Sequence, residues 1–174
     1  VTNQGFDRDQ LSPMSIAAKD ALGRDDLHAI ADKGYFSGSE ILACHEAGIT
    51  TTVPRPATSS NAAKDMYVKA DFTYDAGRDV YVCPAGEDLT YRYTTEERGV
   101  QLRRYWVNAC QTCPVQSKCT TGTERRITRW DHEHLVDDMG NRLGRDPDAM
   151  TLRRCTVEHP FGTIKAWMGH THFL

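Results

Sequence analysis

The pattern of apolar and polar residues in the first part of the chain alternates between helical and strand-like segments. Residues 14–22 and 37–48 have the composition and spacing of helices. Residues 27–31 form a short apolar run of strand length, and residues 49–53 are rich in β-branched side chains and are closed by a proline. A strand, a helix and a second strand in this order predict a βαβ unit with parallel strands.

Polar residues at the helix starts predict how these helices are capped. Ser12 followed by Pro13 is typical of an N-cap and a first helical position. Ser37 with Glu40 three residues later has the spacing of a capping box. Gly23 is expected to end the first helix.

A different pattern follows a Pro-, Ser- and Ala-rich loop at residues 54–63. Residues 72–83 and 89–107 alternate apolar and polar side chains around turn-forming sequences, so each is expected to form a hairpin. The pattern becomes helical again at residues 131–143. Asp146 and Pro147 then predict the start of a further helix that extends through residue 157.

Length and charge limit the possible classes of protein. The chain of 174 residues, 39% of them hydrophobic, suffices for one core and a small additional module. Its net charge of −3 is uneven, with 8 Lys and Arg against 14 Asp and Glu in residues 1–90, and 12 against 9 in residues 91–154. We find no run of eighteen apolar residues and no signal peptide, and therefore expect a soluble, cytoplasmic protein.

Four cysteines fall in the predicted β-rich segment, namely Cys83, Cys110, Cys113 and Cys119. The last three follow a C-x2-C-x5-C spacing, and Pro114 next to the C-x2-C pair is typical of a metal-binding turn. Four thiolates suit tetrahedral zinc, which would stabilise a module that has little apolar core. Disulfides and reduced structural cysteines are the alternatives, and an intracellular location disfavours the first.

Other residues near this pattern have simpler interpretations. His132 and His134 could each replace one sulfur, but solvent-exposed positions are expected for both. Cys44 and Cys155 fall on predicted helices and are expected to be buried as small apolar residues.

Near the end of the chain, Arg154, Glu158 and Lys165 are separated by three and six residues. They share one helix face if the helix continues through Pro160 and Gly162. The spacing resembles the Y-x2-R-x3-E-x6-K signature of insertion-sequence DDE transposases. Thr151 stands where that signature has tyrosine.

A second motif agrees with this resemblance. Asp32 follows a predicted strand and precedes Gly34 and Tyr35, which is similar to the family's second acid in a D-x-G-Y turn. The β-rich segment between Asp32 and Glu158 is similar to the insertion that such transposases carry between their second and third acids. The resemblance therefore covers nearly the whole chain.

The resemblance implies an RNase H-like (retroviral-integrase-like) α/β core with an inserted β-rich module that carries the cysteine cluster. Residues 1–56 would form the first part of the core, residues 57–130 the insertion and residues 131–174 the last helices of the core. The family's first acid lies on an opening strand, for which Asp7 and Asp9 are poor substitutes because they lie too close to the first helix. We therefore expect the first acid upstream of Val1, a fragment that is inactive alone, and a truncated C-terminus.

The same resemblance implies the chemistry. Asp32 and Glu158 would be catalytic carboxylates that hold Mg²⁺ or Mn²⁺ for phosphodiester cleavage and DNA strand transfer. Arg154 and Lys165 would contact phosphates. The expected partner is double-stranded DNA, both the element ends and the target, bound by a homodimer in the bacterial nucleoid.

Each residue also has an ordinary interpretation. Asp32 could be a turn residue, and Arg154 with Glu158 a surface ion pair. The competing hypothesis is a zinc-stapled module that binds DNA or a partner without catalysis, supported by aromatic residues interleaved with arginines at 92, 98, 103, 104, 125, 126 and 129. Ordinary strand aromatics beside a charged outer face explain that pattern equally well. The absence of G-x-S-x-G, P-loop, G-x-G-x-x-G and H-E-x-x-H motifs argues against other hydrolases and nucleotide enzymes.

Overall fold

The computed structural model describes residues 7–97 and 99–168. The chain divides into two compact units. We call residues up to 56 together with those from 134 onward the core unit, and residues 57–133 the insertion unit. No helix among the described residues is long and apolar enough to cross a membrane.

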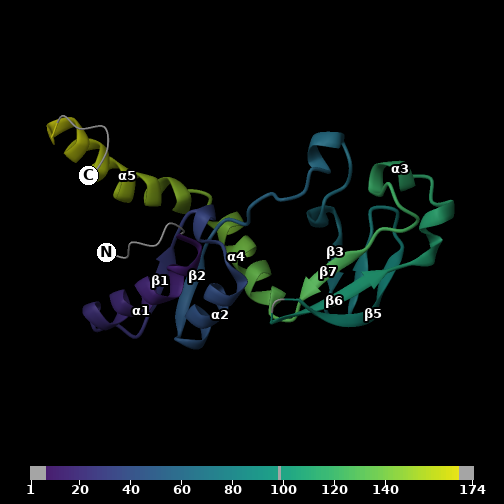
Figure 1. Ribbon diagram of the computed structural model, residues 1–174, viewed down its shortest axis with the longest axis horizontal. Coiled ribbons are helices and arrows are strands. Elements are labelled where there is room, and N and C mark those ends of the chain that lie inside the picture. The colour runs from purple at the N-terminus through teal and green to yellow at the C-terminus, as the bar shows by residue number, and fades with distance from the viewer. Residues whose placement is uncertain (1–6, 98, 169–174) are drawn as a thin grey trace. The chain divides into compact units, whose positions relative to one another are not determined.

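The core unit contains the expected βαβ arrangement (Figure 1). β1 (Leu27–Ile30) and β2 (Ile49–Thr52) are parallel, with Leu27 opposite Ile49, and α2 (Gly38–Glu46) connects them. α1 (Leu11–Leu22) packs against α2. The predicted pair of parallel strands is confirmed, and it is the whole sheet of the described core unit.

The start of α1 is capped differently from the prediction. α1 begins at Leu11, so Ser12 lies inside the helix and is not its N-cap. The Ser12 N–H and hydroxyl both donate to the Glu40 carboxylate, each at 2.8 Å. The predicted Ser37–Glu40 capping box is therefore wrong, because Glu40 bonds to the neighbouring helix and Ser37 makes no side-chain cap. The expected stop at Gly23 is confirmed, since Gly23 has a left-handed φ of 59°.

α4 (Glu133–Arg145) returns to the core unit and packs on β2. The Thr51 hydroxyl lies 3.4 Å from the Met139 sulfur, and Arg142 donates to the Thr51 carbonyl at 2.8 Å. Met139 is buried, as are Ile41 and Cys44 of α2. The expected burial of Cys44 is thus confirmed, whereas Cys155 is exposed and its predicted burial is wrong.

α5 (Ala149–Met168) starts later and continues further than the sequence indicates. The Asp146 N–H donates to the Arg142 carbonyl at 2.9 Å and so closes the last turn of α4 instead of starting α5. The first bond of α5 runs from the Leu152 N–H to the Asp148 carbonyl at 2.8 Å. The backbone remains helical through Pro160 and Gly162.

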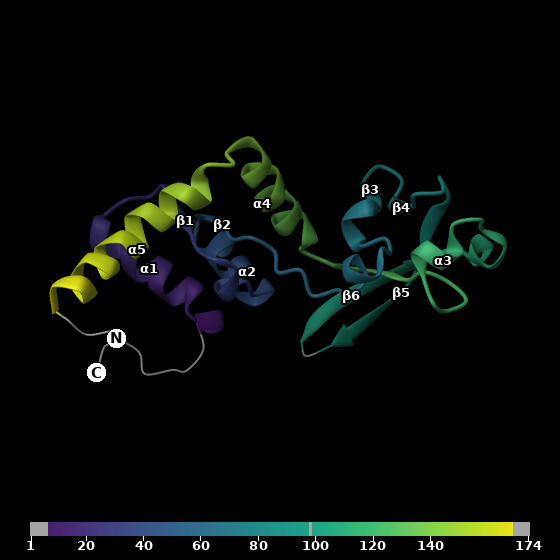
Figure 2. The same cartoon turned by 90° about the horizontal axis from the view of Figure 1, so that it is seen from above.

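The insertion unit is a five-stranded antiparallel sheet in the order β3-β4-β5-β6-β7. Figure 2 labels β3, β4, β5 and β6 of this sheet. Its strands are β3 (Thr73–Asp75), β4 (Val80–Val82), β5 (Asp88–Glu97), β6 (Val100–Trp106) and β7 (Ile127–Trp130). Both expected hairpins are present, β3–β4 and β5–β6. The second turns at Gly99, which has a φ of 76°, while Arg98 beside it lies outside the described residues.

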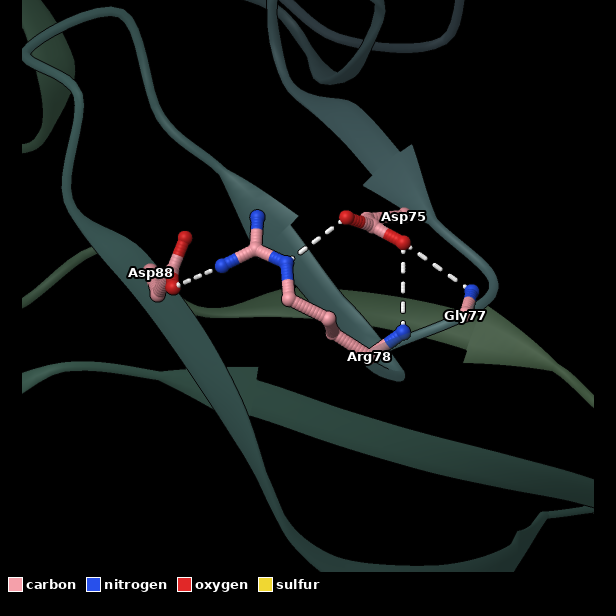
Figure 3. A network of polar contacts seen from close by, with 4 residues as sticks. All are labelled: Asp75, Gly77, Arg78 and Asp88. Carbon is pink, nitrogen blue, oxygen red and sulfur yellow. Dashed lines mark hydrogen bonds and ion pairs between the residues drawn. The ribbon is translucent and has the colours of Figure 1, made fainter.

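The turn of the first hairpin is fixed by one aspartate and one arginine (Figure 3). Asp75 Oδ1 accepts from the Gly77 and Arg78 N–H groups at 2.9 and 3.1 Å. Arg78 donates from Nε to Asp75 at 2.7 Å and from Nη1 to Asp88 at 2.5 Å. These bonds lower the pKa of Asp75, and they tie the turn to the first residue of β5.

Asp79, which follows this turn in a left-handed conformation (φ 53°) and directly precedes β4, bonds to β3 and β6 through its carboxylate. Tyr74 and Tyr105 donate to Oδ1 at 2.7 and 2.8 Å, and Arg103 donates to Oδ2 at 2.5 Å. Burial alone would raise the pKa of Asp79, but these donors outweigh it and hold the pKa below its usual range. Tyr105 lies in the buried cluster of this unit with Phe72.

Candidate active site

Asp32 lies just beyond the end of β1 and caps a short 3-10 helix, η2 (Lys33–Tyr35). Its Oδ1 accepts from the Gly34 N–H at 2.8 Å, as expected for an N-cap carboxylate. A Cβ on Gly34 would lie 3.0 Å from this oxygen, so the turn favours glycine. The Asp32 side chain is 46% exposed and is accessible to a ligand.

Arg153 of α5 reaches this carboxylate. Its Nη2 donates to Asp32 Oδ2 at 3.2 Å, while the Arg153 side chain itself is only 16% exposed. The contact joins residues that are 121 positions apart. It brings the end of β1 and the helix of the R-x3-E-x6-K motif together within the core unit.

Tyr35 adds a phenol to this neighbourhood, and Asp7 adds a second carboxylate. Burial raises the pKa of Tyr35, and the charges of Asp7 and Asp32 raise it further, while Arg153 opposes them. The 3-10 helix η1 (Asp7–Asp9) packs against η2, which explains the influence of Asp7. Asp7 and Asp32 therefore act on the same phenol.

The structure describes the remaining predicted site residues to different extents. Arg154 is exposed on α5. Glu158 and Lys165 belong to the same helix, but their side chains lie outside the described residues. The contact of Arg153 with Asp32 was not predicted from the sequence. The R-x3-E spacing before Glu158 points to Arg154 and not to its neighbour Arg153.

The donor chemistry of this region suits a hard divalent cation only in part. Asp32 offers carboxylate oxygens, the ligand type that Mg²⁺ prefers. Within the described residues, however, no three His, Cys, Asp or Glu side chains form a group that could hold a metal ion. Asp32 is thus the one predicted metal ligand of the core unit whose side chain the structure describes.

The four cysteines of the predicted zinc cluster line one pocket of the insertion unit. All four are free thiols, and Cys119 is buried. Burial raises the pKa of Cys119, and the other three cysteines raise it further, while Arg125 lowers it. His132 does not line this pocket and instead packs against the Trp130 ring at a centroid distance of 5.2 Å. His134 is exposed, as expected.

Arginines and aromatic rings alternate along the β5–β6 hairpin. Arg92 and Arg126 lie over the Trp106 ring, at 5.3 and 5.0 Å from its centroid, and Arg103 lies 4.8 Å from that of Tyr91. Tyr91 and its neighbour Tyr93 are both exposed. Of the other predicted arginines, Arg98 lies outside the described residues, and the remaining ones are less available.

Three of them serve the unit itself. Arg129 is buried and donates to the Tyr81 hydroxyl at 3.2 Å. Arg104 bonds to Thr128 and Glu97, and Arg125 donates to the Cys119 carbonyl at 3.4 Å. Some of the arginines predicted to bind DNA therefore make contacts within the insertion unit instead.

Comparison with known families agrees with the motif on α5. The family model described as transposase DDE domain matches residues 82–174. This range covers more than half of the chain and contains Arg154, Glu158 and Lys165. The chain therefore belongs to the transposase DDE domain family. Neither the curated proteins nor the solved structures gave a match.

Proposed function

We propose that the chain contributes to the catalytic domain of a transposase that cleaves DNA phosphodiesters and transfers strands with a divalent cation. Asp32 and Glu158 are the proposed carboxylate ligands of Mg²⁺ or Mn²⁺. The two carboxylates would hold the cation, which when bound would supply Lewis-acid chemistry for polarising the phosphate and activating the attacking oxygen. The core unit is proposed to be part of an RNase H-like fold, and residues 57–130 its insertion.

The single observation that carries this proposal is the contact between Arg153 and Asp32. It places the helix of the R-x3-E-x6-K motif beside the acid at the end of β1, with a distance of 3.2 Å between the two side chains. In open α/β sheets, ligands bind beyond the carboxyl ends of the strands, where Asp32 lies. The family membership given by residues 82–174 supports the same function.

The face of α5 that is turned toward Asp32 carries Arg153 and not the residues of the predicted motif. Arg154, Glu158 and Lys165 have the spacing of one face, whereas Arg153 stands about 100° away around the axis. Catalysis therefore requires α5 to turn its Arg154 face toward Asp32. Such a turn would replace the contact of Arg153 with Asp32, and Ala149 is the one buried residue among the described side chains of α5.

The phosphate-binding role is proposed for Arg154 and Lys165. The exposure of Arg154 leaves its guanidinium accessible to a DNA phosphate. Two cations beside two carboxylates also reduce the repulsion between the acids and the DNA backbone. The proposed partner is double-stranded DNA, bound by a homodimer on the bacterial nucleoid.

Metal-dependent strand cleavage tests this function. The protein that the insertion sequence encodes is incubated with DNA that carries the ends of that insertion sequence. One sample contains Mg²⁺ and the other contains EDTA. We expect Asp32→Asn and Glu158→Gln each to lower cleavage by about a hundredfold or more, because each removes a ligand of a cation that stabilises the transition state by several kcal/mol. Asp9→Asn, a change on η1, is the control. Unchanged cleavage by Asp32→Asn would exclude the proposed role of this acid.

The second candidate function is a DNA-binding module without catalysis. The observation that favours it is the stacking of Arg92 and Arg126 on Trp106 beside the exposed Tyr91 and Tyr93. Arginine and aromatic side chains together form common nucleic-acid surfaces. DNA binding that is retained by Asp32→Asn, lost in Arg92→Gln/Arg126→Gln, and never accompanied by cleavage would favour this function.

A further inference from the structure

The pocket lined by cysteines is built from segments that are distant in sequence. Cys83 follows β4, Cys110 and Cys113 lie within and just after the 3-10 helix η5 (Asn108–Thr112), and Cys119 ends α3 (Gln116–Cys119). All four line this one pocket as free thiols. The remaining cysteines, Cys44 and Cys155, belong to the core unit.

Tight backbone turns hold three of these cysteines. The Cys83 carbonyl accepts from the Gly86 N–H at 2.8 Å, and Gly86 has a φ of 86° that favours glycine. The Cys110 carbonyl accepts from the Cys113 N–H at 3.2 Å, and the Cys113 carbonyl from the Gln116 N–H at 3.1 Å. Turns of this kind bring two cysteines separated by two residues to one metal ion.

The half-buried Arg125 gives the pocket a positive group with an unused donor. Its guanidinium lies 5.4 Å from the centroid of the Phe72 ring, and its Nη1 donates to the Cys119 carbonyl. Its Nε is buried and has no hydrogen-bond partner among the described residues. A buried donor without an acceptor is destabilising, so a ligand that supplies negative charge and an acceptor would stabilise the pocket.

We propose that Cys83, Cys110, Cys113 and Cys119 bind a structural zinc ion as thiolates. A zinc ion with four thiolate ligands carries net negative charge, which Arg125 offsets, and a ligand sulfur can accept from its Nε. The zinc would hold together the segment between β6 and β7, whose regular structure consists of η5 and α3. This proposal does not depend on the catalytic function.

Binding requires a rearrangement of the thiols. As the side chains stand, no three possible ligands within the described part of the chain form a metal-binding group. Each cysteine reaches a new position by rotation about a single side-chain bond between staggered rotamers. The backbone that carries the four residues already places them around one pocket.

Zinc content and cobalt spectroscopy of the full chain test the proposal. The protein is purified under reducing conditions, and its zinc content is measured by inductively coupled plasma mass spectrometry. We expect about one zinc per chain and, after exchange for Co²⁺, the charge-transfer absorption of thiolate ligands, as four-cysteine sites give. Cys110→Ser/Cys113→Ser should lose both signals. The matched control Cys155→Ser, a change at an exposed cysteine of the core unit, should keep both.

Thiol alkylation of the wild-type protein keeps the test decisive if the double variant fails to fold. Zinc should protect the four pocket cysteines from alkylation, while Cys155 reacts at the same rate with and without zinc. Wild-type protein that contains no zinc after supplementation and shows no thiolate absorption with Co²⁺ would overturn the proposal. Disulfides between the pocket cysteines in freshly purified protein, or equal alkylation with and without zinc, would overturn it as well.

Discussion

Arg153 and Asp32 form an ion pair, with 3.2 Å between Arg153 Nη2 and Asp32 Oδ2. The arginine is mostly buried, whereas the carboxylate is half-exposed and is also held by the Gly34 N–H. The pair therefore fixes the orientation of Asp32 while leaving it accessible to solvent. A cation that binds Asp32 has to compete with the guanidinium for the same oxygen.

This competition predicts different effects for two adjacent arginines. Arg153→Gln should increase the affinity of the protein for Mn²⁺ by up to about fivefold, because a partly exposed ion pair contributes about 1 kcal/mol or less. Arg154→Gln should leave Mn²⁺ affinity nearly unchanged and should weaken DNA binding with a smaller salt dependence. Calorimetric Mn²⁺ titration and DNA binding at several salt concentrations measure the two effects. Equal Mn²⁺ affinity in both variants would contradict the competition.

Glu40 should contribute to stability through α1 and not through its own helix. Glu40→Ala removes the acceptor of the Ser12 N–H and hydroxyl and should lower the free energy of unfolding by about 1–3 kcal/mol. Ser37→Ala is the matched control, since Ser37 makes no side-chain cap, and it should change stability by about 0.5 kcal/mol or less. Urea unfolding measures both. A larger loss in Ser37→Ala than in Glu40→Ala would contradict the observed capping.

His28 should make the stability of the core unit depend on pH. His28 is exposed on β1, yet partial burial of its ring lowers its pKa, as does the charge of Arg142, against the charge of Asp146. Its Nε2 lies 2.8 Å from the Thr52 hydroxyl oxygen. The unfolded chain then binds more protons than the folded chain just below the ordinary histidine pKa of about 6.5, so stability falls as pH decreases through this value and is fully present above it. His28→Gln should reduce this dependence, and His45→Gln, a change at an exposed histidine of α2, should not. Urea unfolding between pH 7.5 and about 5 measures how the free energy of unfolding changes with pH. The same pH dependence in wild type and His28→Gln would contradict the role of His28.

Asp79 should stabilise the insertion unit through three donors. Asp79→Asn keeps the shape and tolerates the left-handed φ of 53°, but it weakens the bonds from Tyr74, Tyr105 and Arg103. We expect a loss of about 1–3 kcal/mol, typical of hydrogen bonds to a charged group. Asp65→Asn, at a mostly exposed aspartate with the same left-handed φ, should be nearly neutral. Hydrogen exchange of β4 and β6 amides reports on this unit, and unchanged exchange in Asp79→Asn would contradict the role of the network.

The elements that the sequence predicted correctly are those fixed by local patterns. The β-branched run at Ile49 and the alternation on both sides of Gly99 suffice to define a strand and a hairpin. The capping of α1 could not be predicted, because Glu40 bonds to a residue 28 positions away instead of its own helix. The same applies to Arg153, whose partner lies 121 positions away and whose neighbour Arg154 is identical in type.

Cleavage of the backbone by bound iron tests whether Asp32 and Glu158 hold one divalent-cation site. Fe²⁺ substituted for Mg²⁺ generates hydroxyl radicals that cut the chain next to the metal, and sequencing of the fragments locates the cuts. We predict cuts beside both residue 32 and residue 158, suppressed by excess Mg²⁺ and absent in Asp32→Asn. Cuts near residue 32 alone, or cuts that persist in Asp32→Asn, would contradict a shared site.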